Sequence, residues 1–119
     1  MTPAAFGKLA LSLPETSAAS HFDVPDYRVA GKIFATAGKL DGKAVLKLTP
    51  DQQQMLCEAE TGMFEPVPNA WGRKGWTNLV LAQADAKTAR SALWMAWRNT
   101  APKTLLKQHP PEMAPEKAQ

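Results

Sequence analysis

The residues with the clearest capacity for chemistry form a short basic loop between two tryptophans, Trp71-Gly72-Arg73-Lys74-Gly75-Trp76. Lysine and arginine neutralise phosphate groups, and glycine lets another backbone approach the main chain closely. A second basic loop, residues 39–43, places Lys39 and Lys43 on either side of an Asp-Gly pair. We therefore expect both loops to contact the phosphate backbone of DNA. The alternative for each loop is an ordinary solvated turn.

The distribution of charge along the chain supports this choice of loops. The formal net charge is only +3. Residues 24–50 nevertheless hold five cations against two acids, residues 51–70 hold four acids and no cation, and residues 71–107 hold seven cations against one acid. Two basic segments are thus separated by an acidic one. The residues expected to contact phosphate are Lys39, Lys43, Arg73 and Lys74, with Lys47, Arg90 and Arg98 extending the basic surface.

Residue types suited to catalysis or metal binding are sparse. The chain has one cysteine and two histidines, and a cysteine-based zinc site needs two to four thiolates. Cys57 is interpreted as a small, partly buried core residue, and His21 as a loop residue hydrogen-bonded to the backbone. We therefore predict no catalytic residue, no metal and no cofactor. An enzyme or small-ligand binder built around His21 and the tryptophan loop is the alternative.

The four tryptophans raise a third function class. Trp76 begins a predicted strand and Trp97 lies in an apolar helical stripe, so both are predicted to be core residues. Trp71 and Trp94 could be either core or exposed contact residues. Exposed tryptophans would mark an interface with a protein partner. The acidic segment 51–70 could bind a partner with a basic surface.

The first half of the chain is predicted to form a helix and then a β-meander. Thr2 and Pro3 start the helix, Pro14 stops it, and residues 15–25 are interpreted as an irregular connector. The predicted strands cover residues 27–30, 32–37 and 43–48, with the Asp-Gly pair turning the chain before the third. In that third strand Ala44, Leu46 and Leu48 alternate with Lys43, Val45 and Lys47, which predicts an apolar inner face and a basic outer face.

The second half is predicted to alternate helices and strands. Thr49 and Gln52 form a capping box for a helix to about residue 60, and prolines confine a short strand at 63–67 to a sheet edge. The basic loop at 69–76, a strand at 77–82 and a helix at 86–99 follow, with a short extra turn through residue 106.

These elements predict an α+β fold, in the order α-βββ-α-β-β-α, with helices from the N-terminus, middle and C-terminus against a curved antiparallel sheet. The 119 residues suit one domain, which we expect to cover residues 1–107, followed by a disordered Pro-rich tail at 108–119. No stretch reaches the length of a membrane helix and no signal peptide is recognised, so we expect a cytoplasmic protein without a membrane partner.

Two motifs resemble a known family. Residues 21–35 contain the hairpin Gly31-Lys32-Ile33-Phe34-Ala35, and the basic loop leads into Trp76-Thr77-Asn78-Leu79. Together they resemble the MmcQ/YjbR-like family of small bacterial proteins, from about residue 6 to residue 106. The resemblance implies an α+β fold and DNA binding through a "double wing" of two hairpin-like projections. It adds Lys32 to the contact residues and carries over Arg73, Lys74 and Trp76. The chain departs from the family at Gly75, where a His or another large polar residue is common.

Overall fold

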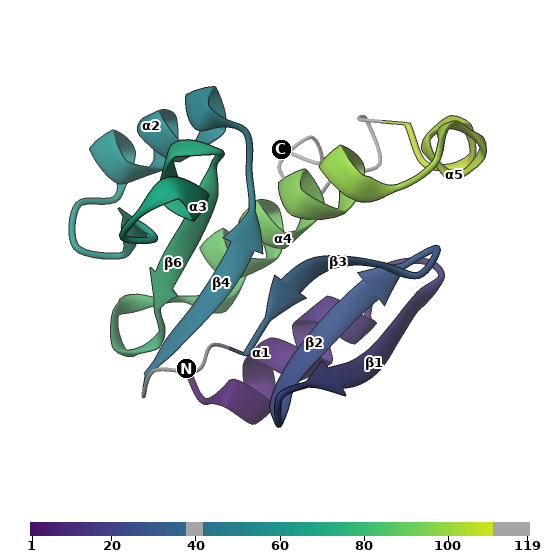
Figure 1. Cartoon of the computed structure of the whole chain (residues 1–119), viewed down its shortest axis with the longest axis horizontal. Coiled ribbons are helices and arrows are strands. Elements are labelled where there is room, and N and C mark those ends of the chain that lie inside the picture. The colour runs from purple at the N-terminus through teal and green to yellow at the C-terminus, as the bar shows by residue number, and fades with distance from the viewer. Residues whose placement is uncertain (38–41, 111–119) are drawn as a thin grey trace.

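The computed structural model describes residues 1–37 and 42–110, in which six strands form one antiparallel sheet (Figure 1). The strand order is β1-β2-β3-β4-β6-β5, which places β5 at an edge as its prolines predict. The strands are β1 (Thr16–His21), β2 (Val24–Val29), β3 (Lys32–Thr36), β4 (Lys43–Lys47), β5 (Phe64–Pro66) and β6 (Trp76–Val80).

Capping residues set the starts of the main helices. The helical segments are α1 (Pro3–Leu11), α2 (Pro50–Ala59), α3 (Ala70–Arg73), the 3-10 turn η1 (Leu81–Gln83), α4 (Ala86–Thr100) and α5 (Lys103–Gln108). Thr2 accepts a hydrogen bond from the Ala5 amide at 3.0 Å, and Thr49 and Gln52 form the predicted capping box of α2. None of the helices in the described ranges is long and apolar enough to cross a membrane.

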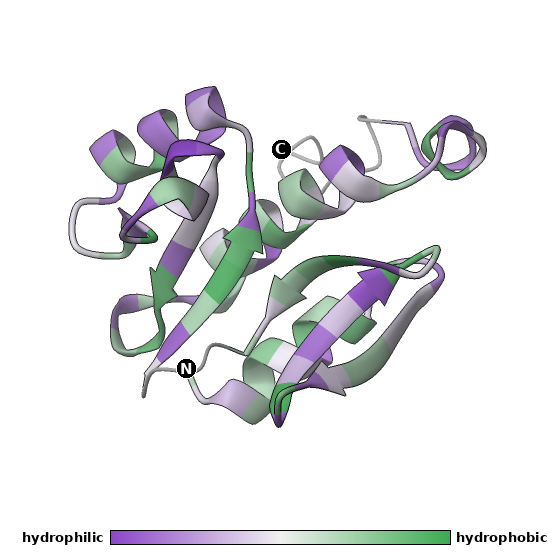
Figure 2. Ribbon diagram, in the orientation of Figure 1, coloured by the Kyte–Doolittle hydropathy of each residue, from purple (hydrophilic) through white to green (hydrophobic). Residues whose placement is uncertain are grey.

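The core lies between one face of the sheet and the helices α1 and α4. The alternation predicted for β4 is confirmed, because Ala44, Leu46 and Leu48 are buried. They pack in one cluster with Trp97 of α4 and Phe6 of α1. The middle of β4 is hydrophobic and its two ends are hydrophilic (Figure 2). The α+β class of the fold is therefore confirmed.

The structure corrects two predicted loops. The connector predicted at 15–25 contains β1, which pairs with β2 over six residues. Its side chains are mostly small and exposed, so an edge strand held by backbone pairing carries no apolar alternation to recognise. The loop predicted at 69–76 contains the short helix α3.

The described residues beyond residue 107 contact the domain. Helix α5 ends at Gln108, and the ring of His109 packs edge-on against Trp97 at a centroid distance of 5.7 Å. The rest of the predicted tail, residues 111–119, lies outside the described residues.

The sheet has a narrow seam between β3 and β4. In the described residues these strands are joined by two pairs, Ala35 with Leu46 and Thr36 with Val45. One half of the sheet, β1-β2-β3, therefore diverges from the other half, β4-β6-β5, and Figure 1 shows the two halves splayed apart.

Candidate functional site

Strand register defines one row of side chains across the sheet. Asp26 pairs with Thr36, Thr36 with Val45, and Val45 with Asn78, while Glu65 pairs with Asn78 from the other side. Directly opposed residues of antiparallel strands point to the same face. This face, called the open face below, is opposite the one that packs on α1 and α4.

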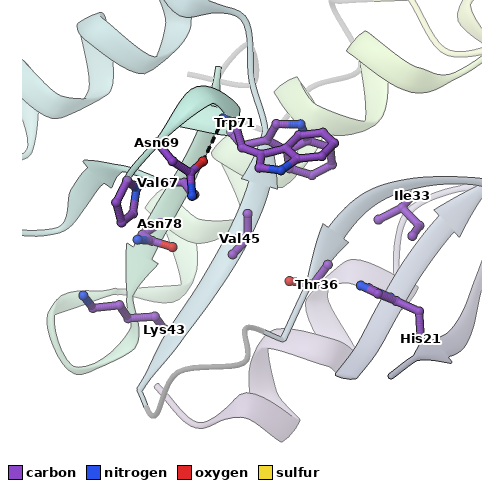
Figure 3. A pocket seen from close by; sticks show the side chains of 11 residues that line it. His21, Ile33, Thr36, Lys43, Val45, Val67, Asn69, Trp71 and Asn78 are labelled. Atoms are coloured by element: carbon purple, nitrogen blue, oxygen red, sulfur yellow. Dashed lines mark hydrogen bonds between the residues drawn. The ribbon is translucent and has the colours of Figure 1, made fainter. Parts of the chain in front are cut away.

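A cavity of about 470 Å³ lies on the open face. Its floor includes Val45 and Asn78. Trp71 lines it from the β4-β6-β5 half, and His21 lines it from the other half (Figure 3). Trp76, on β6, also lines it. The splaying of the sheet at the β3–β4 seam thus creates a space whose walls come from segments far apart in the sequence. The remaining lining residues are Ile33, Thr36, Lys43, Val67, Pro68 and Asn69.

A buried carboxylate holds His21 in place at the cavity. Asp26 is fully buried, and its Oδ2 lies 2.8 Å from His21 Nδ1. Arg28 Nε donates to Asp26 Oδ1 at 2.8 Å and its Nη2 donates to Oδ2 at 3.1 Å. The Arg28 guanidinium, helped by His21, holds the pKa of Asp26 below its usual value against the opposing effect of burial. Since Nδ1 is engaged by Asp26, His21 Nε2 is the ring nitrogen left for a ligand.

The tryptophan wall is fixed by two close backbone approaches. A Cβ on Gly72 would lie 1.8 Å from the carbonyl oxygen of Val67, and one on Gly75 would lie 2.0 Å from that of Leu48. Gly75 also has a φ of +113°, a value that side chains with a Cβ rarely adopt. A side chain at position 75 would therefore require the backbone here to move.

A glutamine from α2 ties the same segment down. Gln53 Nε2 lies 3.0 Å from the carbonyl oxygens of both Gly72 and Trp76. It also lies 3.2 Å from Thr77 Oγ1. Helix α2 therefore supports both ends of the basic loop.

The two tryptophans of the wall differ in exposure. Trp71 is 57% exposed, and Trp76 is partly buried beside it. Their rings meet edge to face, with centroids 6.1 Å apart and planes at 79°. Lys74 Nζ lies 5.0 Å from the centre of the Trp71 ring, within cation–π range. The wall therefore combines aromatic surface with a cation.

Three of the predicted contact residues lie close to Trp76, at one end of the open face. Lys47 pairs with Trp76 across β4 and β6, and Arg73 and Lys74 immediately precede Gly75 and Trp76 in the chain. In the described ranges none of the three forms an ion pair. We call Lys47, Arg73 and Lys74 the basic end.

Lys43 lies at the other end of the cavity. It is separated from Lys47 by the length of β4, about 13 Å at the usual rise of a strand. Its ammonium lies 2.6 Å from Glu65 Oε1, so an acid offsets its charge. Lys39, predicted for the same loop, lies outside the described residues.

The remaining predicted contacts are not brought to the cavity. Lys32 lies beside the β2–β3 turn. Arg90 and Arg98 lie on α4, which packs on the opposite face of the sheet. Arg98 Nη1 donates to the carbonyl oxygen of His109 at 2.7 Å. Arg90 and Arg98 therefore do not extend the basic end.

The structure also tests the interpretation of single residues. His21 lies on β1 and bonds to Asp26 instead of lying in a loop and bonding to the backbone. Trp97 is buried as predicted, and Trp94 is buried too. Trp76 lines the cavity instead of the core. Neighbouring residues of a strand point to opposite faces. Because Thr77 and Leu79 of β6 face the core, Trp76 faces the cavity.

Cys57 has the partly buried position that the sequence predicts. Burial, followed by nearby glutamates, raises the pKa of its thiol. Such a thiol is a poor nucleophile. No group of three or more His, Cys, Asp or Glu residues within residues 1–37 and 42–110 could hold a metal ion.

Comparison with known proteins identifies both a family pattern and a related fold. A family model described as YjbR matches residues 11–99. The crystal structure of Deinococcus radiodurans protein DR2400, assigned to a domain called DUF419, superposes with a TM-score of 0.70. It covers 90% of this chain and 86% of that one at 18% sequence identity, which establishes similarity of fold. No curated protein matches the chain significantly.

Proposed function

The chain belongs to the YjbR family, and on that premise we propose that it is a non-enzymatic DNA-binding protein whose open face lies against the phosphate backbone. The observation that carries the proposal is the basic end. Lys47, Arg73 and Lys74 lie there without acidic partners in the described residues. Such a role would place the protein in the cytoplasm.

The charges elsewhere on the open face are largely balanced. Arg28 is paired with Asp26, and Lys43 with Glu65. The excess positive charge of this face therefore comes from the basic end. Approach of DNA from that side requires no ion pair to break, so we expect it to be the first point of contact.

Contacts of this kind favour affinity over selectivity. Phosphates are the same at every position of a duplex, so cations that touch them fix the protein's position without reading the sequence. We therefore propose weak sequence selectivity. Contacts by Lys32, Arg90 and Arg98 would require DNA to extend beyond the open face, and the proposal does not depend on them.

The test is the salt dependence of binding to a labelled duplex. Each neutralised phosphate contributes about −0.9 to the slope of log K against log salt. Three cations predict a slope of about −2.7, or a loss of about 40-fold in affinity between 50 and 200 mM salt. Absence of binding at 50 mM, or binding that salt does not weaken, would overturn the proposal.

A further inference from the structure

We propose that the cavity on the open face receives one unpaired nucleobase. The base could belong to a DNA strand held at the basic end or to a free nucleotide, because the recognising chemistry is the same. For a strand as the source, the inference rests on the proposed function.

The cavity has the composition of a site for a flat, partly polar ring. Its volume of about 470 Å³ lies within the usual range for small-molecule sites, about 300–1,000 Å³. Val45, Ile33, Val67 and Pro68 give it apolar walls. A few polar groups converge on it from different strands, which is the arrangement that fixes a ligand's orientation.

The tryptophan wall offers a surface for stacking. Trp71 and Trp76 stand at 79° to each other. A flat base that stacks on the face of one ring therefore meets the other ring nearly at a right angle. Because every base has a π-face, stacking on tryptophan tolerates any base, in agreement with the weak selectivity proposed above.

An unpartnered amide lies on the floor of the cavity. Asn78 is only 6% exposed, and its side chain has no hydrogen-bond partner within the part of the chain that the structure describes. Figure 3 shows it among the lining residues. An amide presents a donor and an acceptor side by side, which matches the paired donors and acceptors on the edge of a base. The amide lines the cavity, so a ligand there can form hydrogen bonds with it directly.

His21 supplies a polar group from the opposite wall. Asp26 fixes the ring through Nδ1, which leaves Nε2 available to the cavity. His21 and Asn78 belong to different halves of the sheet, on either side of the β3–β4 seam. A base between them would be held by both halves.

The experiment compares three probes: a fully paired duplex, the same duplex with one bulged 2-aminopurine, and free AMP. Binding at low salt is followed by anisotropy and by the fluorescence of 2-aminopurine, which stacking quenches. For AMP the quenching of tryptophan emission is followed. We expect the bulged duplex to bind at least about 5-fold more tightly than the paired one, the lower end of the effect of stacking one base, and to be quenched.

Two variants assign the effect to the cavity. Trp71→Ala and Asn78→Leu should each remove most of the preference for the bulge while leaving binding of the paired duplex within about 2-fold. Trp71→Phe should retain the quenching, because a flat ring remains. Met55→Ala removes an exposed apolar side chain from α2 and serves as the control that should change nothing.

The outcomes separate the two proposals. Salt-dependent binding of the paired duplex, with no gain from the bulge and no effect of Trp71→Ala, overturns the base site and leaves the DNA-binding function intact. Binding of AMP that Trp71→Ala abolishes, without binding of any duplex, overturns the DNA-binding function and supports the base site with a free nucleotide. Failure of all three probes overturns both.

Discussion

Two charge-matched double variants would locate the DNA-binding surface. Arg73→Ala with Lys74→Ala removes two cations from the basic end. Lys87→Ala with Arg90→Ala removes two exposed cations from α4, which packs on the opposite face of the sheet. Both variants lower the net charge by the same amount, so any difference between them reports position on the surface.

The expected magnitudes follow from the number of unpaired cations at the basic end. With Lys47, Arg73 and Lys74 in contact, the salt slope is about −2.7; with Lys47 alone it is about −0.9. Between 50 and 200 mM salt the Arg73/Lys74 variant should therefore lose only about 3.5-fold in affinity, where the wild type loses about 40-fold. The Lys87/Arg90 variant should keep the wild-type slope. The affinity difference between the Arg73/Lys74 variant and the wild type should therefore be largest at the lowest salt.

The assay is fluorescence anisotropy of a labelled duplex at four or more salt concentrations, with a thermal melt of each variant. Arg73, Lys74, Lys87 and Arg90 are all exposed, so both variants should fold like the wild type. Equal slopes for the two variants would refute the assignment of the basic end. A flatter slope for Lys87/Arg90 alone would move the interface to α4.

Three further predictions test the geometry of the site. Glu65→Gln frees Lys43 and should steepen the salt slope by about 0.9; an unchanged slope would show that Lys43 does not reach DNA. Gly75→Ala should lower the free energy of unfolding by about 3 kcal/mol or more. The control Gly62→Ala, where φ is also positive but a Cβ would meet nothing within 4 Å, should lower it by about 1 kcal/mol. Equal losses for the two variants in denaturant melts would contradict the steric argument. Arg28 lowers the pKa of Asp26 from its usual value of 3.8. The contribution of the Asp26 carboxylate to the stability of the fold should therefore be complete above about pH 5. It should be lost progressively as the pH falls below the pKa that Asp26 has in the unfolded chain. Asp26→Asn should cost about 1.5–3 kcal/mol at neutral pH and flatten this acid limb of the stability curve, and an unaltered limb would contradict the role of the carboxylate.

Local signals predicted the elements that bury a face or carry a cap. The alternation of Ala44, Leu46 and Leu48 defined β4 because one side of that strand faces the core. The capping box of α2 could be predicted because Thr49 and Gln52 bond to each other, only three residues apart in the sequence. Both depend on interactions that the chain encodes locally or with a fixed period.

The cavity could not be predicted in the same way. Its His21 wall stands on β1, whose small exposed residues give no periodic signal. The bond from His21 to Asp26 spans the β1–β2 hairpin, which the sequence does not predict. One clue was available: with Thr77 and Leu79 turned inward, Trp76 and Asn78 had to share the other face of β6. The basic loop was found from composition, but its place beside Lys47 depends on the pairing of β4 with β6.

The β3–β4 seam has a mechanical consequence. In the described residues two pairs join these strands, while α4 packs on both of them from behind. The two halves of the sheet are therefore held together by this short ladder and by the helices behind it, since α1 also contacts strands of both halves. We expect the angle between the halves to be adjustable. A molecule bound between His21 and Trp71 would contact both halves of the sheet and so restrain their relative motion. Its binding should slow amide hydrogen exchange at Ala35 and Leu46, residues that face the core and touch no ligand.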